Sequence, residues 1–273
     1  MTVCFMACRK EHSNSSTQQD QEEFAAVIAE SDAEAESIFN DVFDNVIGVN
    51  DDVGINGVGI YNASSSTNTQ CFTVITSHLS TSSFFPIRIV LDFGMGCVGI
   101  DGKTRKGKVI TEYSNRLLIA GALAATRFEG YMVNDLKIEG THSVINNSTT
   151  TFPSFQINVS GKLSSSNGNF TEWYSEKTIS KVDGNLDLLT FDDAFKVTGF
   201  ASGSVRKNDR FFQWSTNISE PLVKRFNCRW LVKGVVTIKK GALEIAILDY
   251  GSGQCDAKAS FTVLGRTREI SLH

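Results

Sequence analysis

The chain has 273 residues, of which 41% are apolar, and carries a formal net charge of −4. This is enough for one large domain or two small ones with an ordinary hydrophobic core. The slightly acidic charge gives the protein no reason to bind nucleic acid or other polyanions. No stretch approaches the ~20 consecutive apolar residues of a membrane-spanning helix. Glycine is frequent and proline rare, which favours a sheet protein with polar outward faces.

Residues 1–8 resemble the end of a bacterial lipoprotein signal, because small Ala7 precedes Cys8 after a short apolar run. A complete signal has about 7–15 apolar residues in this run, so we expect the true start to lie upstream, with Met1 inside the signal. Cys8 is then the predicted lipidated first residue of the mature protein, and residues 9–20 are a polar tether. The alternative is a cytosolic N-terminus with incidental cysteines.

Residues 21–48 are predicted to be a helical segment, because apolar residues recur there at intervals of three and four. Ser31 and Glu34 have the spacing of a capping box, so the segment is one helix or two, with its end at Gly48. The apolar stripe should pack on the sheet, and we interpret the acidic remainder as a solvated face. The stripe comprises Phe24, Val27, Ile28, Ile38, Phe39, Val42, Phe43 and Val46.

Residues 49–273 are predicted to form a β domain. It opens with a Gly, Asn and Ser rich loop at 50–70, with one short strand at 57–61. Asn134-Asp135, Asn167-Gly168 and Asn208-Asp209 are predicted turns between later strands. Adjacent antiparallel strands of this kind predict a mainly β fold, a meander forming a sandwich or open barrel, with an N-terminal helical segment. Outside the cysteine hairpins described below, the predicted strands cover residues 108–118, 122–133, 136–145, 152–163, 170–180, 195–205, 211–219, 257–264 and 267–272.

A short motif occurs twice, as LDFGMGC at residues 91–97 and as LDYGSGQC at 248–255. Each copy follows another cysteine, and the two cysteines are 26 residues apart in the first copy and 27 in the second. A basic, glycine-containing stretch comes after each. We interpret the pattern as an internally duplicated cysteine-hairpin unit that covers residues 71–110 and 228–272.

The repeated unit predicts two disulfides, Cys71–Cys97 and Cys228–Cys255. In each unit the midpoint of the two cysteines falls on a predicted turn, at 80–85 and 239–242. Residues equidistant from a hairpin turn have Cβ atoms roughly 4.5–5.5 Å apart, close to what a disulfide requires. Disulfides indicate an oxidising compartment and therefore export.

The same cysteines and aspartates could have other roles, as free thiols or as metal ligands. The four cysteines could be free buried thiols or a zinc site, although zinc-type Cys-x2-Cys spacing is missing. Asp92 with Asp101, or Asp249 with Asp256, could offer carboxylates to calcium, but without the dense oxygen spacing of calcium loops. More simply, Asp92 and Asp249 hydrogen-bond the bent backbone beside their glycines.

The chain resembles a family of uncharacterised exported lipoproteins of Bacteroidota. The resemblance includes the lipoprotein cysteine and covers most of the chain, and it implies export and a β fold but no activity. The segments that carry it are SIFNDVFDNV at 37–46, VLDFGMGC at 90–97, DGKTRKGK at 101–108, GYMVN at 130–134, EGT at 139–141, PLVK at 221–224 and CRW at 228–230.

No catalytic residue is predicted. The four histidines, His12, His78, His142 and His273, have neither metal-ligand nor Ser-His-Asp spacing. The basic run at 103–108 is interpreted as a solvated turn.

Two surface sites are alternatives. Glu129 and Glu139 flank a turn and could be the paired carboxylates of a glycoside hydrolase. Trp173, Tyr174 and Trp214 could stack on sugar rings, although residues that are adjacent in a strand point to opposite faces, so one of Trp173 and Tyr174 should be buried.

The sequence therefore predicts a lipid-anchored structural or interaction protein without catalytic activity, in the outer membrane of the bacterial envelope. Its predicted partners are the membrane, through Cys8, and a glycan or another envelope protein, with no cofactor, metal or nucleic acid. A glycan-binding module is the first alternative and a glycoside hydrolase the second.

Overall fold

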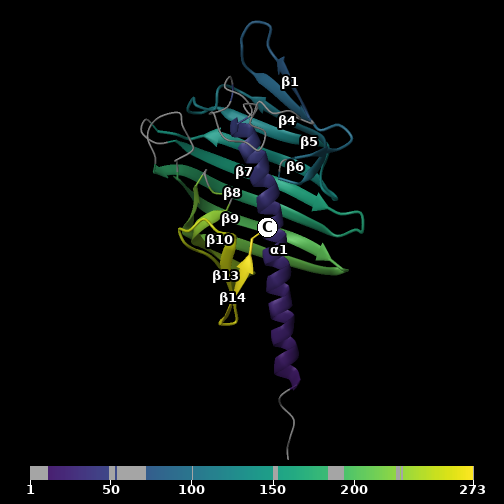
Figure 1. The fold of residues 1–273 in the computed structure, drawn as a ribbon, viewed down its shortest axis with the longest axis vertical. Coiled ribbons are helices and arrows are strands. Elements are labelled where there is room, and N and C mark those ends of the chain that lie inside the picture. Colours follow the sequence, from purple (N-terminus) through teal and green to yellow (C-terminus); the bar gives the residue numbers. More distant parts are fainter. Residues whose placement is uncertain are drawn as a thin grey trace, which may run out of the picture.

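The computed structural model describes residues 12–48, 53, 72–99, 101–149, 153–183, 194–225, 228 and 230–272, with helix side chains from residue 20 onward. The described residues form one helix, α1 (His12–Gly48), and one antiparallel sheet (Figure 1). The strands are β1 (Thr73–His78), β2 (Ile87–Asp92), β3 (Cys97–Val98), β4 (Thr104–Tyr113), β5 (Leu123–Val133), β6 (Leu136–Asn146), β7 (Ser154–Ser164), β8 (Phe170–Asp183), β9 (Ala194–Lys207), β10 (Arg210–Arg225), β11 (Leu231–Lys240), β12 (Leu243–Ser252), β13 (Lys258–Val263) and β14 (Arg266–Ser271).

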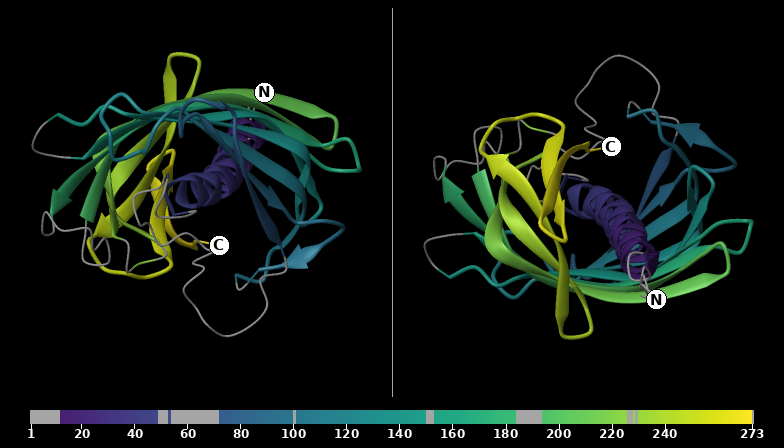
Figure 2. Two further views of the ribbon diagram at one scale, coloured as in Figure 1. Left: turned by 90° about the horizontal axis from the view of Figure 1, so that it is seen from above. Right: turned by 90° about the horizontal axis from the view of Figure 1, so that it is seen from below.

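The sheet is a meander in which consecutive strands are neighbours from β1 to β14, except that β3 pairs with β4 beside the main path. It curls around α1 without closing, so β1 and β14 stand at opposite ends of the strand order (Figure 2). The predicted mainly β meander is confirmed, in the form of one open, curled sheet.

The predicted turns form because Asn and Gly accept the left-handed backbone that tight hairpins require. Asn134 has φ +53°, Asn208 and Asp209 have +52° and +62°, and Gly168 has +87°. The predicted strand at 57–61 lies outside the described residues.

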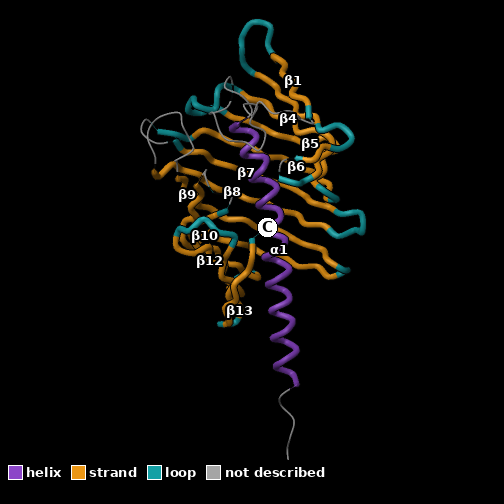
Figure 3. Tube along the Cα trace, in the orientation of Figure 1, coloured by secondary structure: helices purple, strands orange, loops and turns teal. Residues whose placement is uncertain are grey.

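Helix α1 is continuous, so of the two alternatives the single helix is correct and Ser31 is not a helix start. The Ser31 hydroxyl donates to the carbonyl of Val27, four residues earlier, as Ser does inside a helix and not at its start. The helix ends at Gly48 as predicted but begins at His12, so residues 12–20 are helical, and its first turns extend past the sheet (Figures 1 and 3).

The predicted apolar stripe of α1 packs on the inner face of the sheet. Ile38, Phe39, Val42 and Phe43 are each at most 5% exposed. Tyr113 of β4 fixes the C-terminal end of the helix, because its hydroxyl donates to the carbonyl of Val46 at 2.9 Å. The core of the protein is therefore the space between α1 and the sheet.

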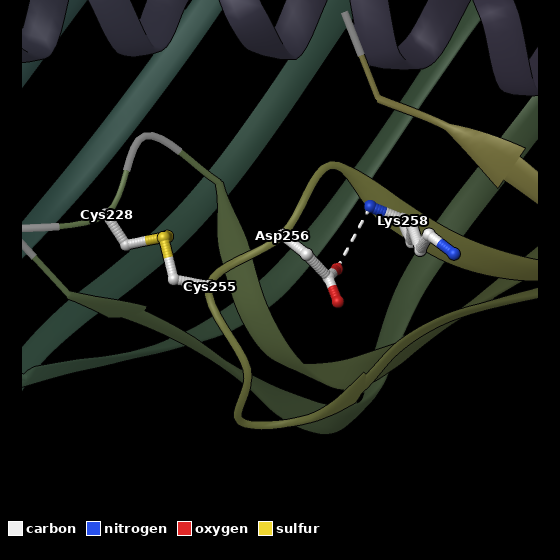
Figure 4. Close-up of a disulfide and its surroundings, with 4 residues drawn as sticks. All are labelled: Cys228, Cys255, Asp256 and Lys258. Carbon is white, nitrogen blue, oxygen red and sulfur yellow. Dashed lines mark hydrogen bonds between the residues drawn. A yellow bond between two sulfur atoms is a disulfide. The ribbon is translucent and has the colours of Figure 1, made fainter.

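The predicted Cys228–Cys255 disulfide is present, with a Cα–Cα distance of 5.8 Å (Figure 4). Cys97 is also disulfide-bonded, but its predicted partner Cys71 lies outside the described residues. Cys97 belongs to β3, which pairs with β4, whereas Cys255 lies in the loop between β12 and β13. The two cysteine segments therefore differ in strand pairing.

The two cysteine segments have matching hydrogen bonds between aspartate side chains and backbone amides. The Asp92 carboxylate accepts from the Gly94 amide at 2.9 Å, and the Asp249 carboxylate accepts from the Gly251 amide at 2.8 Å. Downstream of each cysteine, a second aspartate accepts from the amide two residues later, as Figure 4 shows for Asp256 and Lys258. These bonds confirm that the aspartates stabilise bent backbone.

Candidate functional site

Helix α1 carries nine acidic residues and neither Lys nor Arg. Six of the nine acids form ion pairs with cations of the sheet. The prediction of a solvated acidic face is wrong for Glu36, Asp41 and Asp44, whose side chains are at most 20% exposed, whereas the other three remain exposed. The pairs are Glu22–Arg266 at 3.4 Å, Glu23–Arg210 at 2.5 Å, Glu30–Lys207 at 2.5 Å, Glu36–Lys177, Asp41 with Lys103 at 3.1 Å and Arg105 at 2.8 Å, and Asp44–Lys224 at 3.3 Å.

Arg105 joins α1 to the start of β4. Its side chain is fully buried, and the guanidinium donates to both carboxylate oxygens of Asp101, at 2.9 and 2.7 Å, and to Asp41. Burial acts to raise the pKa of Asp101, but the hydrogen bonds and charge of Arg105 outweigh it and hold that pKa below its usual value. Because Lys103 also contacts α1, the predicted solvated turn at 103–108 is wrong.

Two tryptophans lie under the middle of α1. Trp173 and Trp214 are 4% and 5% exposed, and the Trp173 ring stacks on Phe39 with centroids 5.6 Å apart. Glycines make room for these rings: a Cβ at Gly161 would overlap Phe39, and one at Gly203 would lie 2.7 Å from the Trp214 ring. The prediction that both tryptophans serve a sugar-stacking surface is wrong, because α1 covers the face to which they point.

Asp32 accepts a hydrogen bond from the Trp173 indole nitrogen at 2.7 Å. Burial raises the pKa of Asp32, while the Lys177 charge and the indole groups of Trp173 and Trp214 partly oppose it. The Trp214 Nε1 nevertheless lacks a hydrogen-bond partner of good geometry among the described residues. Asp32 thus accepts from one neutral donor, Trp173, and has the Lys177 cation nearby.

His142 is buried beside this cluster, on the same inner face. Burial lowers its pKa to about 3, so the ring is neutral at ordinary pH. Neither ring nitrogen has a hydrogen-bond partner among the described residues, although a neutral imidazole has one donor and one acceptor to satisfy.

Two cavities of about 30 Å³ each lie along the helix within the described part of the chain. One is lined by Asp32, Glu36, Lys177 and Tyr250, and the other by His142, Ser175 and, again, Glu36 and Lys177. Each has room for about one water molecule. With α1 docked, neither of these two cavities has room for a substrate.

The residues of the two alternative sites that lie on the outside of the sheet are Tyr174, Glu129 and Glu139. Tyr174 is 43% exposed, as the alternation with Trp173 predicts, and its ring is tilted by 43° to that of Phe200. Glu129 pairs with Arg127 at 2.5 Å, and Glu139 pairs with Lys137 at 2.6 Å. The two glutamates are thus each engaged by a cation of their own strand.

The remaining predicted ligands do not converge. Among the described residues, His, Cys, Asp and Glu form no group of three or more that could hold a metal ion. His78 is exposed, with Nδ1 2.9 Å from the Phe84 carbonyl oxygen. Cys8 and His273 lie outside the described residues, as does the side chain of His12.

Sequence reasoning missed Asp32, Glu36, Lys177 and Arg105. One available indication was the charge of the helix: nine acids without a single Lys or Arg cannot form the i to i+4 ion pairs that usually support a solvated helix. Such a helix is better supported by cations from elsewhere in the chain. Which strand supplies them depends on the curl of the sheet.

Comparison with protein-family models, curated proteins and solved structures finds no significant match. Within the described residues, no helix has both the length and the apolar character needed to cross a membrane. The contacts between α1 and the sheet are therefore the basis for a functional proposal.

Proposed function

We propose that the protein is a non-catalytic interaction protein, held at the bacterial outer membrane by a lipid on Cys8. The observation that carries the proposal is the filled inner face of the sheet: α1 occupies the hollow in which a curled sheet would hold a substrate, and the two cavities described along it are water-sized. Helix α1 is held in this hollow by ion pairs, and we infer that such an arrangement serves the binding of another molecule and not catalysis.

The polar groups of the inner face support binding over catalysis. Asp32 is engaged by Trp173 and Glu36 by Lys177. A general acid or base must reach the reacting atoms of a substrate, and these groups instead hold α1 in place. On the outside, the tilt between Tyr174 and Phe200 gives a flat sugar-stacking surface little support.

The anchoring part of the proposal rests on the cysteines and on the helix start. The Cys228–Cys255 disulfide is typical of an exported protein. Helix α1 begins at His12, four residues after Cys8. With a rise of about 1.5 Å per residue, its projecting end would act as a short rigid spacer between a lipid at Cys8 and the sheet.

We also propose that the two cysteine segments, 71–110 and 228–272, arose by duplication. The matching aspartate to amide hydrogen bonds at Asp92 and Asp249 support this origin. The different pairing of β3 would then be a later divergence.

Metabolic labelling with palmitate tests the anchor. The protein, expressed from its natural start in a bacterial host, should incorporate label and fractionate with the outer membrane, and Cys8→Ser should abolish both. Cys4→Ser, a change in the same segment, should keep the label. Labelling that persists in Cys8→Ser would refute the proposed lipid site.

A further inference from the structure

The open sheet has two free edges. Strand β1 stands at one end of the strand order and β14 at the other, and among the described residues each pairs with one neighbour alone. Every side chain of β1 is exposed, on both faces of the sheet. A free edge strand presents unpaired backbone N–H and C=O groups, which can pair with a strand of another chain.

Charge distinguishes the two edges. Strand β14 carries Arg266, Arg268 and Glu269, and charges on an edge strand oppose pairing with other chains. Strand β1 has the sequence TVITSH and contains no Lys, Arg, Asp or Glu. Its apolar side chains Val74 and Ile75 are 42% and 48% exposed. Strand β1 also lies at the end of the molecule opposite to the projecting start of α1 (Figures 1 and 3), so a lipid at Cys8 would not obstruct this edge.

The pairing with β2 determines which backbone groups of β1 face outward. The Leu79 amide donates to the Pro86 carbonyl at 2.9 Å, in the same register as the pairing of β1 with β2. Hydrogen-bonded and non-hydrogen-bonded pairs alternate along an antiparallel ladder. Every second residue counted back from Leu79 therefore bonds to β2, and the residues between them direct their N–H and C=O groups away from it. These outward-facing residues are Val74, Thr76 and His78.

The outward-facing residues match the symmetry of a two-fold dimer. Thr76 is their centre, with Val74 and His78 two positions away on either side. When a second β1 runs antiparallel with Thr76 opposite Thr76, all three residues of each copy pair with outward-facing residues of the other. His78 then faces Val74 and not a second histidine. The pairing therefore satisfies the free backbone groups and opposes no like charges.

We propose that β1 is a self-association edge, at which two copies of the protein pair antiparallel about Thr76 to form one continuous sheet. The inference rests on the proposed interaction function and names a second copy of this chain as a partner. Homo-oligomers usually have closed symmetry, and a two-fold contact uses the same surface on both copies. A strand of six residues forms a small interface, so we expect a weak dimer that is populated at high protein concentration.

The test places opposite charges at position 76 of the full chain carrying Cys8→Ser, which removes the proposed lipid. Thr76→Lys sets two lysines opposite each other in the dimer and Thr76→Glu sets two glutamates, so each variant alone should be monomeric. An equimolar mixture should form a one-to-one dimer, because lysine then faces glutamate. Sedimentation velocity over a concentration series should show the mixture binding about tenfold more tightly than either variant alone.

Matched changes at the other edge are the control. Thr267→Lys and Thr267→Glu introduce the same charges at an exposed position of β14. Chains that carry them should dimerise as the Cys8→Ser chain does. Circular dichroism should show that all four charge variants are folded, because both positions are exposed.

Hydrogen exchange gives a second measurement with residue resolution. Raising the concentration of the Cys8→Ser chain should protect the amides of Val74, Thr76 and His78, which face outward in the monomer. The amides of Ile75 and Ser77 bond to β2 in monomer and dimer alike, so their protection should not change with concentration.

A Cys8→Ser chain that stays monomeric at its highest attainable concentration would overturn the proposal, as would a dimer that Thr76→Lys leaves unchanged. Protection of the outward-facing amides in a monomer would also overturn it, because a strand of the same chain would then occupy the edge. None of these measurements needs the lipid at Cys8. Absence of a dimer together with intact palmitate labelling would therefore reject the second copy as a partner and leave the proposed anchor standing.

Discussion

At the scale of single residues, the polar groups in unusual surroundings lie between α1 and the sheet, and Asp32 of α1 is the clearest case. Its side chain is half-buried and its pKa is raised, with burial as the main cause. The folded state therefore binds the proton more tightly than the unfolded state, whose pKa is near the usual 3.8. Stability due to Asp32 is present below that value and falls as the pH rises through the raised pKa.

Asp32→Asn should accordingly stabilise the protein near neutral pH, because the amide oxygen still accepts from Trp173 while the buried charge is gone. The gain over wild type should shrink as the pH falls. The urea midpoint, measured from about pH 7 down to about pH 4, follows this difference.

Asp92→Asn is a control of opposite sign. The hydrogen bond from the Gly94 amide is the main cause that lowers the pKa of Asp92, so its contribution is present above the unfolded value and is lost as the pH falls through the folded one. An Asp32→Asn variant that is less stable than wild type at neutral pH would contradict the assignment.

Gly161 gives a second residue-scale prediction. An added methyl group would overlap the Phe39 ring, and overpacking of a core typically costs about 1–3 kcal/mol. Gly161→Ala should therefore lower the free energy of unfolding by that amount, as measured by urea denaturation followed by tryptophan fluorescence. Ser160→Ala, one position away with an exposed side chain, should change it by less than about 0.5 kcal/mol.

Residue identities alone could predict only part of this site. Alternation along β8 predicted that Trp173 and Tyr174 would differ in exposure, and they do. Which of the two is buried depends on the position of α1, which no local pattern of β8 contains. For the same reason, the role of Gly161 was not visible, since it depends on Phe39, more than a hundred residues earlier.

At the scale of elements, α1 combines two kinds of attachment. Its apolar stripe was predictable because helical periodicity is local. Its ion pairs were not, because the cations come from strands far away in the chain, such as Lys177 in β8 and Lys224 in β10. The capping-box pattern at Ser31 does not mark a helix start, because the Ser31 hydroxyl donates back to the Val27 carbonyl inside the helix.

Docking of α1 should weaken with salt. Several of its ion pairs are partly exposed, and the Debye length falls from about 10 Å at 0.1 M to about 3 Å at 1 M ionic strength. Hydrogen exchange of α1 amides should accelerate at 1 M NaCl, while that of β7 and β8 should stay the same. Unchanged exchange in α1 would show that the apolar stripe alone holds it.

The hairpin of β11 and β12 is closed by Cys228–Cys255, with a sequence separation of 27 residues. Loss of such a crosslink costs ~3 kcal/mol in the chain-entropy account, so Cys228→Ser with Cys255→Ser should lower the free energy of unfolding by about that amount. Cys255→Ser alone should reduce the yield more than the double change, because it leaves Cys228 free to mispair.

Peptide mapping under non-reducing conditions checks both disulfides. It should find Cys228 joined to Cys255 and, as the sequence predicts, Cys71 joined to Cys97. A Cys71–Cys228 link would contradict both pairings.

At the scale of the whole molecule, the meander was largely predictable. Turns such as Asn208-Asp209 separate the strands, and short turns join neighbours in the sheet. Neither turns nor alternation determine the curl of the sheet or its failure to close. The sequence therefore left a sandwich and an open barrel as alternatives, and the helix in the hollow favours the open form.

The span of the helix contacts has a consequence for biosynthesis. Glu22 and Arg266 are 244 positions apart in the chain, so α1 emerges from the ribosome long before β14, the strand that supplies its last cation. The part of its apolar stripe around Phe39 can pack against Phe128 and Trp173 as soon as β5 and β8 have been made. The ion pair of Glu22 can form only once the last hairpin has been made, so a chain cut short before β14 would keep the middle of α1 covered but would leave its N-terminal part without this cation, and therefore easier for a protease to reach.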